Sequence, residues 1–412
     1  MSDNDLEVRI LNAVDRQRLV DMCVRLADTV SLTGEEEPAA RLVGDELERL
    51  GMEVQYQEVE AGRPNVIGRL RGTGGGNTLM FNAHLDHFDT PEPTLVEGDR
   101  VYGRGLVNMK CAFAGYIEAV AALQRAGASL AGDIIVSGVV GEIEKAQIGQ
   151  YQGAQYRGGG LGATYLMSHG LAADHCIIGE PTGLRLQIGN EGLTLARINV
   201  SSAGDDWVEK TFRMAEAIKA WEPEYQRKYP HPFMLPIVRV GALDGGHPFK
   251  PGVLPSANLY LHVRTLPGVP TMAIQRDLEQ VCAAAAAGDP DLRWSVELYL
   301  STQGYEIPFD SPVAGAVANA HRRVFGRRVE YGEPLRYAIT SDGSHMFHHG
   351  LPAVTYGAGF GSYLVDPTEP RQEVGEAWNT ASGRRRGVGI TNLLNCTKVY
   401  ALAALDLCGQ AR

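Results

Sequence analysis

A histidine and an aspartate follow one apolar strand of the sequence at a spacing that suits metal chemistry. In the segment LMFNAHLDHFDT, residues 79–90, the strand ends in His84 and Asp86. An imidazole at such a position can bind a metal ion. Because side chains alternate along an extended chain, a carboxylate two residues later lies on the same side and can orient that imidazole. The pair alone is also common in surface turns, so its meaning depends on what lies near it.

Two later strands end in acidic side chains. The segment DIIVSGVVGEIEKAQIG, residues 133–149, is apolar up to Glu142 and Glu144. The segment DHCIIGEPTG, residues 174–183, is apolar up to Glu180. Ligands in open α/β sheets gather at the carboxyl ends of the strands. Each strand end taken alone is more often solvated, but together with the histidine they predict a shared site.

The predicted elements around these segments form an α/β pattern. Helical spacing of apolar residues predicts helices at residues 15–26, 38–50 and 109–126, and alternation or apolar runs predict strands at 52–59, 65–70, 78–82 and 133–140. A glycine-rich turn at the start of VYGRGLVNMKCAFAGYIEAV, residues 101–120, exposes N–H groups at the positive end of the third helix. Alternating strands and helices indicate an α/β domain.

The middle of the chain has a different pattern. Strands are predicted at 194–201, 257–264 and 292–300, helices at 207–221 and 277–287, and a proline-rich stretch at 223–236. The α/β pattern then returns with a helix at 312–325, a strand at 353–356 and a helix at 392–407. We therefore expect a first catalytic part at 1–193, an inserted α+β segment at 194–303, and a second catalytic part at 304–412.

Composition excludes several classes of protein. The chain has 412 residues, 44% of them hydrophobic and 21% charged, which is ordinary for a globular protein. Its net charge of −11 disfavours nucleic-acid binding. Its six cysteines are scattered, which argues against disulfides or a thiolate zinc site. With a polar N-terminus and no long apolar run, these features predict a cytoplasmic protein that does not bind membranes.

The order of the motifs resembles one known family. HxD, GRGxxxMK, a strand-end glutamate and GEPT are similar to the pattern of the acetylornithine deacetylase, succinyl-diaminopimelate desuccinylase, aminoacylase and carboxypeptidase G family. GGHPFKPGVLP at 245–255, HVRTLPG at 262–268, SDG at 341–343 and LPAVTYGAG at 351–359 extend the resemblance over nearly the whole chain. It implies a zinc-exopeptidase-like catalytic domain with an inserted lid and dimerisation domain, and hence a homodimer or a higher homo-oligomer.

The resemblance also implies roles for particular residues. The family binds two zinc ions bridged by an aspartate and a water. His84 and Glu180 match the ligands of the first metal, and Asp86 matches the carboxylate that orients the histidine. Glu142 matches the general base, which takes a proton from the activated water and later delivers it to the leaving nitrogen.

The sequence departs from the family at the other metal subsite. The bridging aspartate is Asn108, the second glutamate of the family's Glu-Glu pair is Ile143, and no histidine follows His349. We therefore predict one divalent ion, held by His84, Asn108 and Glu180. One imidazole with oxygen ligands suits Mn²⁺ at least as well as Zn²⁺.

Two alternatives to this single-metal site remain open. Glu144, or one of His345, His348 and His349 in the motif SHMFHHG, could restore a second subsite, although local hydrogen bonding is the more ordinary role for these histidines. Loss of both metals would instead leave a catalytically inactive small-molecule-binding protein.

Two residues of the inserted segment are candidates for substrate binding. Arg264 matches the family arginine that pairs with a substrate carboxylate, a role that suits a planar guanidinium, although a structural salt bridge is the alternative. His247 could donate a hydrogen bond to the oxyanion or the leaving group, and it could equally be an ordinary loop histidine.

These features predict a hydrolase that cleaves a C–N bond of a small carboxylate-bearing substrate. One metal must leave the oxyanion to protein donors, whereas an electron-poor aromatic ring can hold the negative charge itself. We therefore favour hydrolytic deamination of an aryl amine such as 5-nitroanthranilate. The alternative is hydrolysis of N-acyl amino acids or dipeptides.

Overall fold

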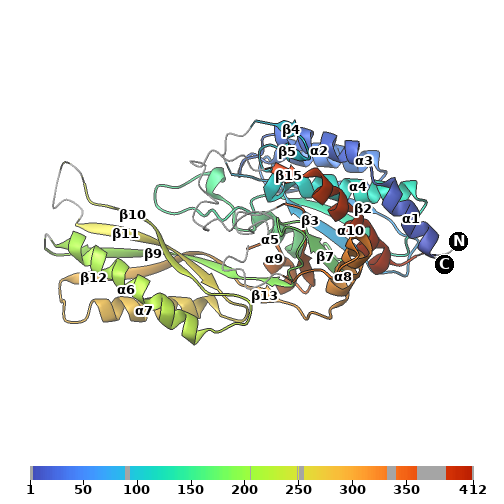
Figure 1. The fold of residues 1–412 in the computed structure, drawn as a ribbon. Helices are drawn as coiled ribbons and strands as arrows, with labels where there is room; N and C mark the ends of the chain where they lie inside the picture. The colour runs from blue at the N-terminus through green and yellow to red at the C-terminus, as the bar shows by residue number, and fades with distance from the viewer. Residues whose placement is uncertain are drawn as a thin grey trace. The chain divides into compact units, whose positions relative to one another are not determined.

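The chain forms two compact units in this computed structural model (Figure 1). The structure describes residues 3–88, 93–204, 206–247, 249, 255–331, 340–359 and 387–410. One unit combines the chain up to Gly189 with most of the chain from Ile307 onward, and the other contains Asn190–Glu306. The boundaries predicted from sequence, after residues 193 and 303, fall a few residues inside the second unit.

A six-stranded sheet forms the centre of the first unit. Its order is β1 (Glu53–Glu60), β2 (Arg63–Leu70), β6 (Ile134–Val139), β3 (Leu79–His84), β7 (His175–Ile178) and β14 (Ala353–Thr355). β3 pairs in parallel with both β6 and β7, and β14 pairs in parallel with β7. The carboxyl ends of these four strands therefore lie at one edge of the sheet, where the polar residues of the motifs are.

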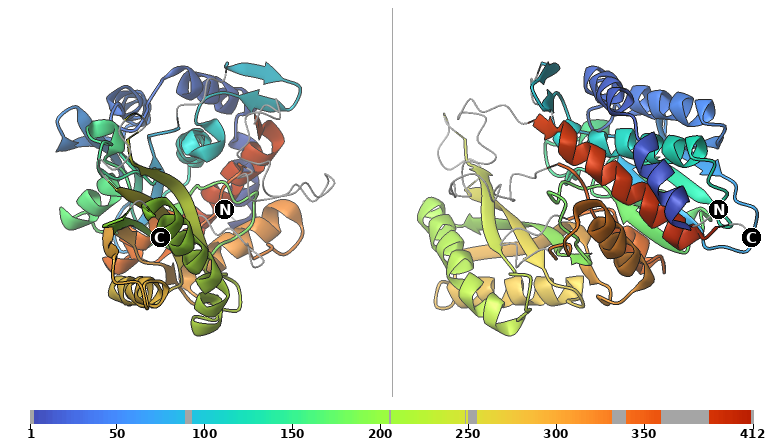
Figure 2. Two further views of the ribbon diagram at one scale, coloured as in Figure 1. Left: turned by 90° about the vertical axis from the view of Figure 1, so that its left-hand side faces the viewer. Right: turned by 45° about the vertical axis from the view of Figure 1, so that its right-hand side comes forward.

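Helices cover both faces of this sheet. Phe81 in β3 packs against Tyr116 of α4 (Cys111–Arg125) and Tyr400 of α10 (Ile390–Cys408), with ring centroids 4.8 and 5.5 Å apart. The next residue, Asn82, bonds instead to Asp342, which immediately precedes α9 (Gly343–His348). Because successive side chains of a strand point to opposite faces, α4 and α10 lie on one face and α9 on the other (Figure 1 and Figure 2).

The remaining helices of the first unit complete these layers. They are α1 (Asp3–Ala13), α2 (Arg16–Asp28), α3 (Glu37–Arg49), α5 (Leu161–Ser168) and α8 (Pro312–Phe325). Three short strands, β4 (Leu95–Glu97), β5 (Arg100–Tyr102) and β15 (Gly387–Gly389), form a separate small sheet. Among the described helices, one stretch, Leu106–Arg125, is long and apolar enough to cross a membrane, and 89% of its most apolar window is buried within the protein. It is therefore a core helix.

The second unit has a four-stranded antiparallel sheet. Its order is β10 (Val238–Gly245), β11 (Ser256–Thr265), β9 (Gly192–Ser202) and β12 (Leu292–Thr302), and α6 (Trp207–Lys228) and α7 (Thr271–Ala285) contact it. A short pair, β8 (Gly189–Asn190) with β13 (Tyr305–Glu306), lies where the unit joins the rest of the chain in sequence. Buried side chains of the larger sheet and of both helices form its core.

The predicted end of the first helix in this unit is wrong. The sequence placed it at Trp221, before the proline-rich stretch, but α6 continues through Pro223 to Lys228. Tyr225 is fully buried and its ring lies 4.7 Å from that of Trp221. Burial of a large aromatic side chain can outweigh the single hydrogen bond that a proline removes from a helix.

Candidate metal centre

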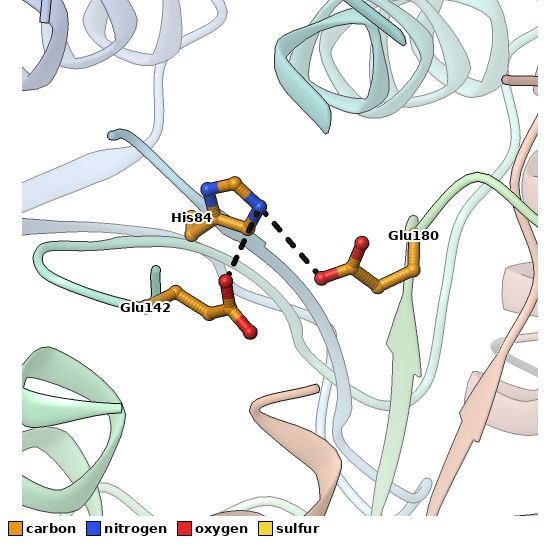
Figure 3. Close-up of side chains that lie close together, drawn as sticks. All are labelled: His84, Glu142 and Glu180. Carbon is orange, nitrogen blue, oxygen red and sulfur yellow. Dashed lines mark ion pairs between the residues drawn. The ribbon is translucent and has the colours of Figure 1, made fainter. Parts of the chain in front are cut away.

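Three strand ends bring one imidazole and two carboxylates together in the first unit. Ligand atoms of His84, Glu142 and Glu180 all lie within 4.8 Å of one another, and all three residues are buried. Nε2 of His84 is 3.7 Å from Oε2 of Glu142 and 3.7 Å from Oε1 of Glu180 (Figure 3). A divalent ion bound about 2.0–2.2 Å from each atom could be shared at these separations.

The hydrogen bonds of His84 leave one ring nitrogen for a cation. Nδ1 is 2.8 Å from the backbone oxygen of Asp86, and a carbonyl only accepts, so Nδ1 carries the proton. Nε2 lies 2.8 Å from Oδ1 of Asn108, which is also an acceptor. Oε2 of Glu180 is buried and has no hydrogen-bond partner among the described residues. A lone pair, an amide oxygen and an unsatisfied carboxylate form a donor set that fits a divalent ion.

Without an ion, a proton takes the same place. Burial would lower the pKa of His84, but the charge of Glu142 and the contacts with Asp86 and Glu180 hold that pKa well above its usual value. Burial raises the pKa of Glu180 to about 8, since the charge of His84 only partly opposes it. Burial also raises the pKa of Glu142, reinforced by Glu180 and Asp342. Protons and a cation therefore compete for this cluster.

Asp86 connects the histidine to the loop that carries Glu142. Its carboxylate oxygen lies 3.6 Å from Nδ1 of His84, farther than its backbone oxygen. The carboxylate instead accepts the N–H groups of Glu142 and Ile143 at 3.0 and 3.2 Å and the hydroxyl of Thr33 at 2.8 Å. Burial would raise the pKa of Asp86, but these contacts and His84 lower it overall.

Asn108 reaches the histidine from an irregular turn. It lies in the short helical segment Leu106–Lys110, which follows Gly105 at φ +67° and contains a cis peptide bond between Asn108 and Met109. A side chain at Gly105 would collide with His87 and Lys110. The glycine-rich motif therefore allows the close approach that puts the amide oxygen beside the imidazole.

Lys110 is a buried cation in the same turn. Its ammonium donates to the backbone oxygen of Thr29 at 2.7 Å and to the hydroxyl of Ser31 at 3.4 Å. Burial lowers its pKa to about 7, and the charge of Arg104 adds to the effect. Sequence reasoning gave this lysine no role, because the partners lie about 80 residues away in the chain.

The candidates for a second subsite are not part of this cluster. Ile143 is buried and apolar, and Glu144 is half-buried, with its charge contributing to the raised pKa values of Glu142 and Glu180. Nδ1 of His345 is 2.9 Å from the hydroxyl of Thr164.

The motif that contains these histidines is helical. Residues Gly343–His348 form α9. His349 directly follows it and bonds through Nδ1 to the backbone oxygen of His345. His349 thus has a local hydrogen bond, whereas His345 bonds to Thr164 in α5, a residue distant in the chain.

Arg264 and His247 belong to the second unit. Arg264 is the penultimate residue of β11, and Glu191, a fully buried carboxylate, directly precedes the paired strand β9. Burial raises the pKa of Glu191 to about 8, and the positive charge of Arg264 opposes that shift. His247 is exposed, and its Nδ1 accepts the N–H of Phe249. The neighbouring Pro248 and residues 250–254 of the same motif lie outside the described residues.

Asp342 is an acid of the centre that sequence reasoning missed. It is 1% exposed, its Oδ2 accepts the amide N–H of Asn82 at 2.9 Å, and burial raises its pKa to about 6. The SDG motif at 341–343 was the available signal. The SDG motif was given no role in the site, because nothing in the sequence indicates that α9 begins beside β3.

Comparison with known proteins identifies the family. The profile described as Peptidase family M20/M25/M40 matches residues 80–374, which is more than half of the chain. The chain belongs to this family. It is 25% identical over 292 residues to an acetylornithine deacetylase from Aliivibrio fischeri (strain MJ11), covering 66% of this chain and 72% of the relative. It is 21% identical over 358 residues to N-formyl-4-amino-5-aminomethyl-2-methylpyrimidine deformylase from Bacillus subtilis (strain 168), covering 76% and 80%.

Solved structures share the fold. A tripeptidase from Staphylococcus aureus superposes with a TM-score of 0.69 at 18% identity, over 96% of this chain and 99% of that one. A dinuclear metal-binding peptidase of the M20 family from Bacillus subtilis has a TM-score of 0.66 at 15% identity, over 96% and 99%. The predicted resemblance and the α/β fold with an inserted α+β domain are thus confirmed. This member of the M20 family is a metal-dependent hydrolase with a candidate metal site at His84, Glu142 and Glu180.

Proposed function

We propose that this M20 hydrolase uses one divalent cation to cleave a C–N bond of a small carboxylate-bearing molecule. The observation that carries the proposal is the convergence of His84 and Glu180 with Asn108 around one ring nitrogen. A neutral amide stands where a bridging carboxylate would be needed, and an apolar Ile143 follows Glu142. Mn²⁺ and Zn²⁺ both suit one imidazole with oxygen donors.

Glu142 is the proposed general base. A bound divalent cation would supply Lewis acidity and lower the pKa of a water molecule. The raised pKa of Glu142 makes its carboxylate a suitable acceptor for the proton of that water and a suitable donor toward the leaving nitrogen. The backbone N–H of Glu142 donates to the carboxylate of Asp86, and this hydrogen bond fixes the position from which the Glu142 side chain extends.

Two substrate classes fit this centre. Hydrolytic deamination of an electron-poor aryl amine, such as 5-nitroanthranilate, is the leading one, because the ring can hold the charge that a second cation would otherwise stabilise. Amide hydrolysis of N-acyl amino acids is the second, and it is favoured by relatives named as a deacetylase and a deformylase. In either class Arg264 is proposed to pair with the substrate carboxylate and His247 to donate a hydrogen bond, within a homodimer formed through the second unit.

Product analysis separates the two classes. The Mn²⁺-loaded protein is incubated with a panel of nitro-substituted anilines that carry a carboxylate and with a panel of N-acyl amino acids. Release of ammonia from the anilines supports deamination, and release of a carboxylic acid from the second panel supports amide hydrolysis. Protein that binds one Mn²⁺ but releases neither product from either panel would contradict the proposed reaction.

A further inference from the structure

A chain of buried polar groups runs beneath the metal centre. Asn82 lies two residues before His84 on β3, so both side chains are on the same face of the sheet. The amide oxygen of Asn82 accepts the hydroxyl of Ser137 in β6 at 2.7 Å. Its amide nitrogen donates to Oδ2 of Asp342 at 2.9 Å. The whole chain is buried, and Asn82 and Ser137 are in the middle of otherwise apolar strands.

The second oxygen of Asp342 is not satisfied. Oδ1 is buried and has no hydrogen-bond partner among the described residues. The negative charge of Asp342 acts on Glu142 and Glu180, and the positive charge of His84 acts on Asp342. The hydrogen bond to Asn82 holds Asp342 on the face of β3 that carries His84, although Asp342 is not one of the three residues whose ligand atoms converge.

Such a group is costly in a protein without a cation. A buried carboxylate that lacks half of its hydrogen bonds destabilises the fold, and two neighbouring buried carboxylates increase that cost. With a divalent ion in the cluster, each nearby negative charge would stabilise the protein instead of destabilising it, because the charge would attract the ion. Outer groups that hydrogen-bond to metal ligands commonly change metal affinity by a factor of about 10–100, and a buried negative charge near the ligands also attracts the cation directly.

We propose that Asp342 is a positioning residue of the metal centre whose negative charge strengthens the binding of the divalent cation while destabilising the cation-free protein. This inference rests on the proposed single-cation function. Asn82 fixes the position of the Asp342 carboxylate through a hydrogen bond, and Ser137 in turn fixes the amide group of Asn82. The neutral Asn108 contributes no negative charge to the metal centre, and the carboxylate of Asp342 would partly replace that charge.

The test compares the full chain with its Asp342→Asn variant at pH 8. The new side chain has the same shape and can still accept the N–H of Asn82, but it carries no charge. Metal-free protein is prepared with a chelator, and Tm and the Kd for Mn²⁺ are measured by calorimetry. We expect the Kd to rise about tenfold or more. We also expect the Tm of the metal-free variant to rise by about 2 °C, because an unsatisfied buried charge has been removed.

Glu118→Gln is the matched control. Glu118 is a 2% exposed carboxylate of the same unit whose contacts are the backbone of Asp15 and two arginines, Arg18 and Arg125. Removing its charge is expected to lower the Tm, because its partners lose their ion pairs, and to leave the Kd for Mn²⁺ unchanged. A Tm that rises for Asp342→Asn and falls for Glu118→Gln would show that the charge of Asp342 serves cation binding, whereas the charge of Glu118 stabilises the fold.

Two results would overturn the inference about Asp342. One is a Kd for Mn²⁺ equal to that of the unmodified chain, and the other is a metal-free Tm that falls as it does for Glu118→Gln. Asp342→Ser provides a second neutral variant if the amide disturbs folding, and the same loss of affinity is expected. If the unmodified chain binds no Mn²⁺, the proposed function fails, whereas the Tm comparison still reports on the role of Asp342.

Discussion

The carboxylate of Asp86 accepts the backbone N–H of Glu142 at 3.0 Å, so the residue two positions after the histidine ligand also fixes the proposed base. The same carboxylate accepts the N–H of Ile143 at 3.2 Å. The carboxyl ends of β3 and β6 are therefore connected by one side chain. A change at Asp86 should act on proton transfer by Glu142 as well as on the orientation of His84.

Asp86→Asn is expected to reduce turnover while leaving some cation binding. The amide group cannot accept hydrogen bonds from Thr33 and from both backbone N–H groups, so at least one buried donor is left unsatisfied. That costs about 1–3 kcal/mol in the free energy of unfolding. Urea unfolding of the metal-free protein and kcat of the loaded protein test this. Unchanged kcat would show that Asp86 does not position the base.

Glu142→Gln is expected to abolish the proton transfer but not cation binding. Loss of a general base commonly reduces turnover by about 10²–10⁴. His84, Asn108 and Glu180 remain as ligands, so the Kd for Mn²⁺ should change by much less than the rate. Calorimetry on the variant checks this. Loss of the cation would instead assign Glu142 as a ligand, which its distance of 3.7 Å from the imidazole nitrogen allows.

The contribution of Glu180 to the stability of the cation-free protein should fall as pH rises from about 5 to about 8. The pKa of Glu180 is raised from an ordinary 4.5 to about 8, so in this window the folded chain keeps a proton that the unfolded chain has lost. Folding therefore binds protons, and raising the pH disfavours it. The raised pKa of His84 acts in the same direction. The Tm in chelator should decrease across this range relative to the Tm of a Glu180→Gln variant, and added Mn²⁺ should stabilise the unmodified chain more at pH 8 than at pH 6.

Restoring two carboxylates should rebuild the second subsite. Asn108→Asp alone is expected to leave one cation per chain, because Ile143 still offers no ligand. The double change Asn108→Asp with Ile143→Glu should bind two, as measured by metal analysis of protein dialysed against Mn²⁺.

The single change Ile143→Glu is the control for this experiment. Ile143 is 2% exposed, so an added carboxylate is buried and should destabilise the metal-free chain by several kcal/mol. Two ions bound by the unmodified protein would contradict the single-cation proposal.

The sequence predicted the strand ends well because their pattern is local. Apolar runs that stop at His84, Glu142 and Glu180 indicate buried strands, and the rule for parallel sheets places their carboxyl ends together. The structure brings ligand atoms of these three residues within 4.8 Å of one another. The helices α2, α3 and α8 were predicted to within two residues at each end for the same reason, whereas α1 was not predicted.

Features that depend on distant contacts could not be predicted. The polar Asn82 inside β3 makes sense only with Asp342, which is 260 residues away in the chain. Lys110 likewise bonds to Thr29, a residue of a different element. The continuation of α6 past Pro223 depends on the buried side of the second unit. Local patterns contain no information about such partners, because tertiary packing decides them.

The acids of the centre come from both sides of the inserted segment Asn190–Glu306, and this has a consequence during synthesis. A ribosome that has already made Glu180 must complete the whole inserted unit before it makes Asp342 and β14. Until then β7 is an open edge of the central sheet, and exposed strand edges of nascent chains are prone to aggregate. Translation must therefore pass through a long interval in which the chain has its first ligands but cannot yet close its sheet.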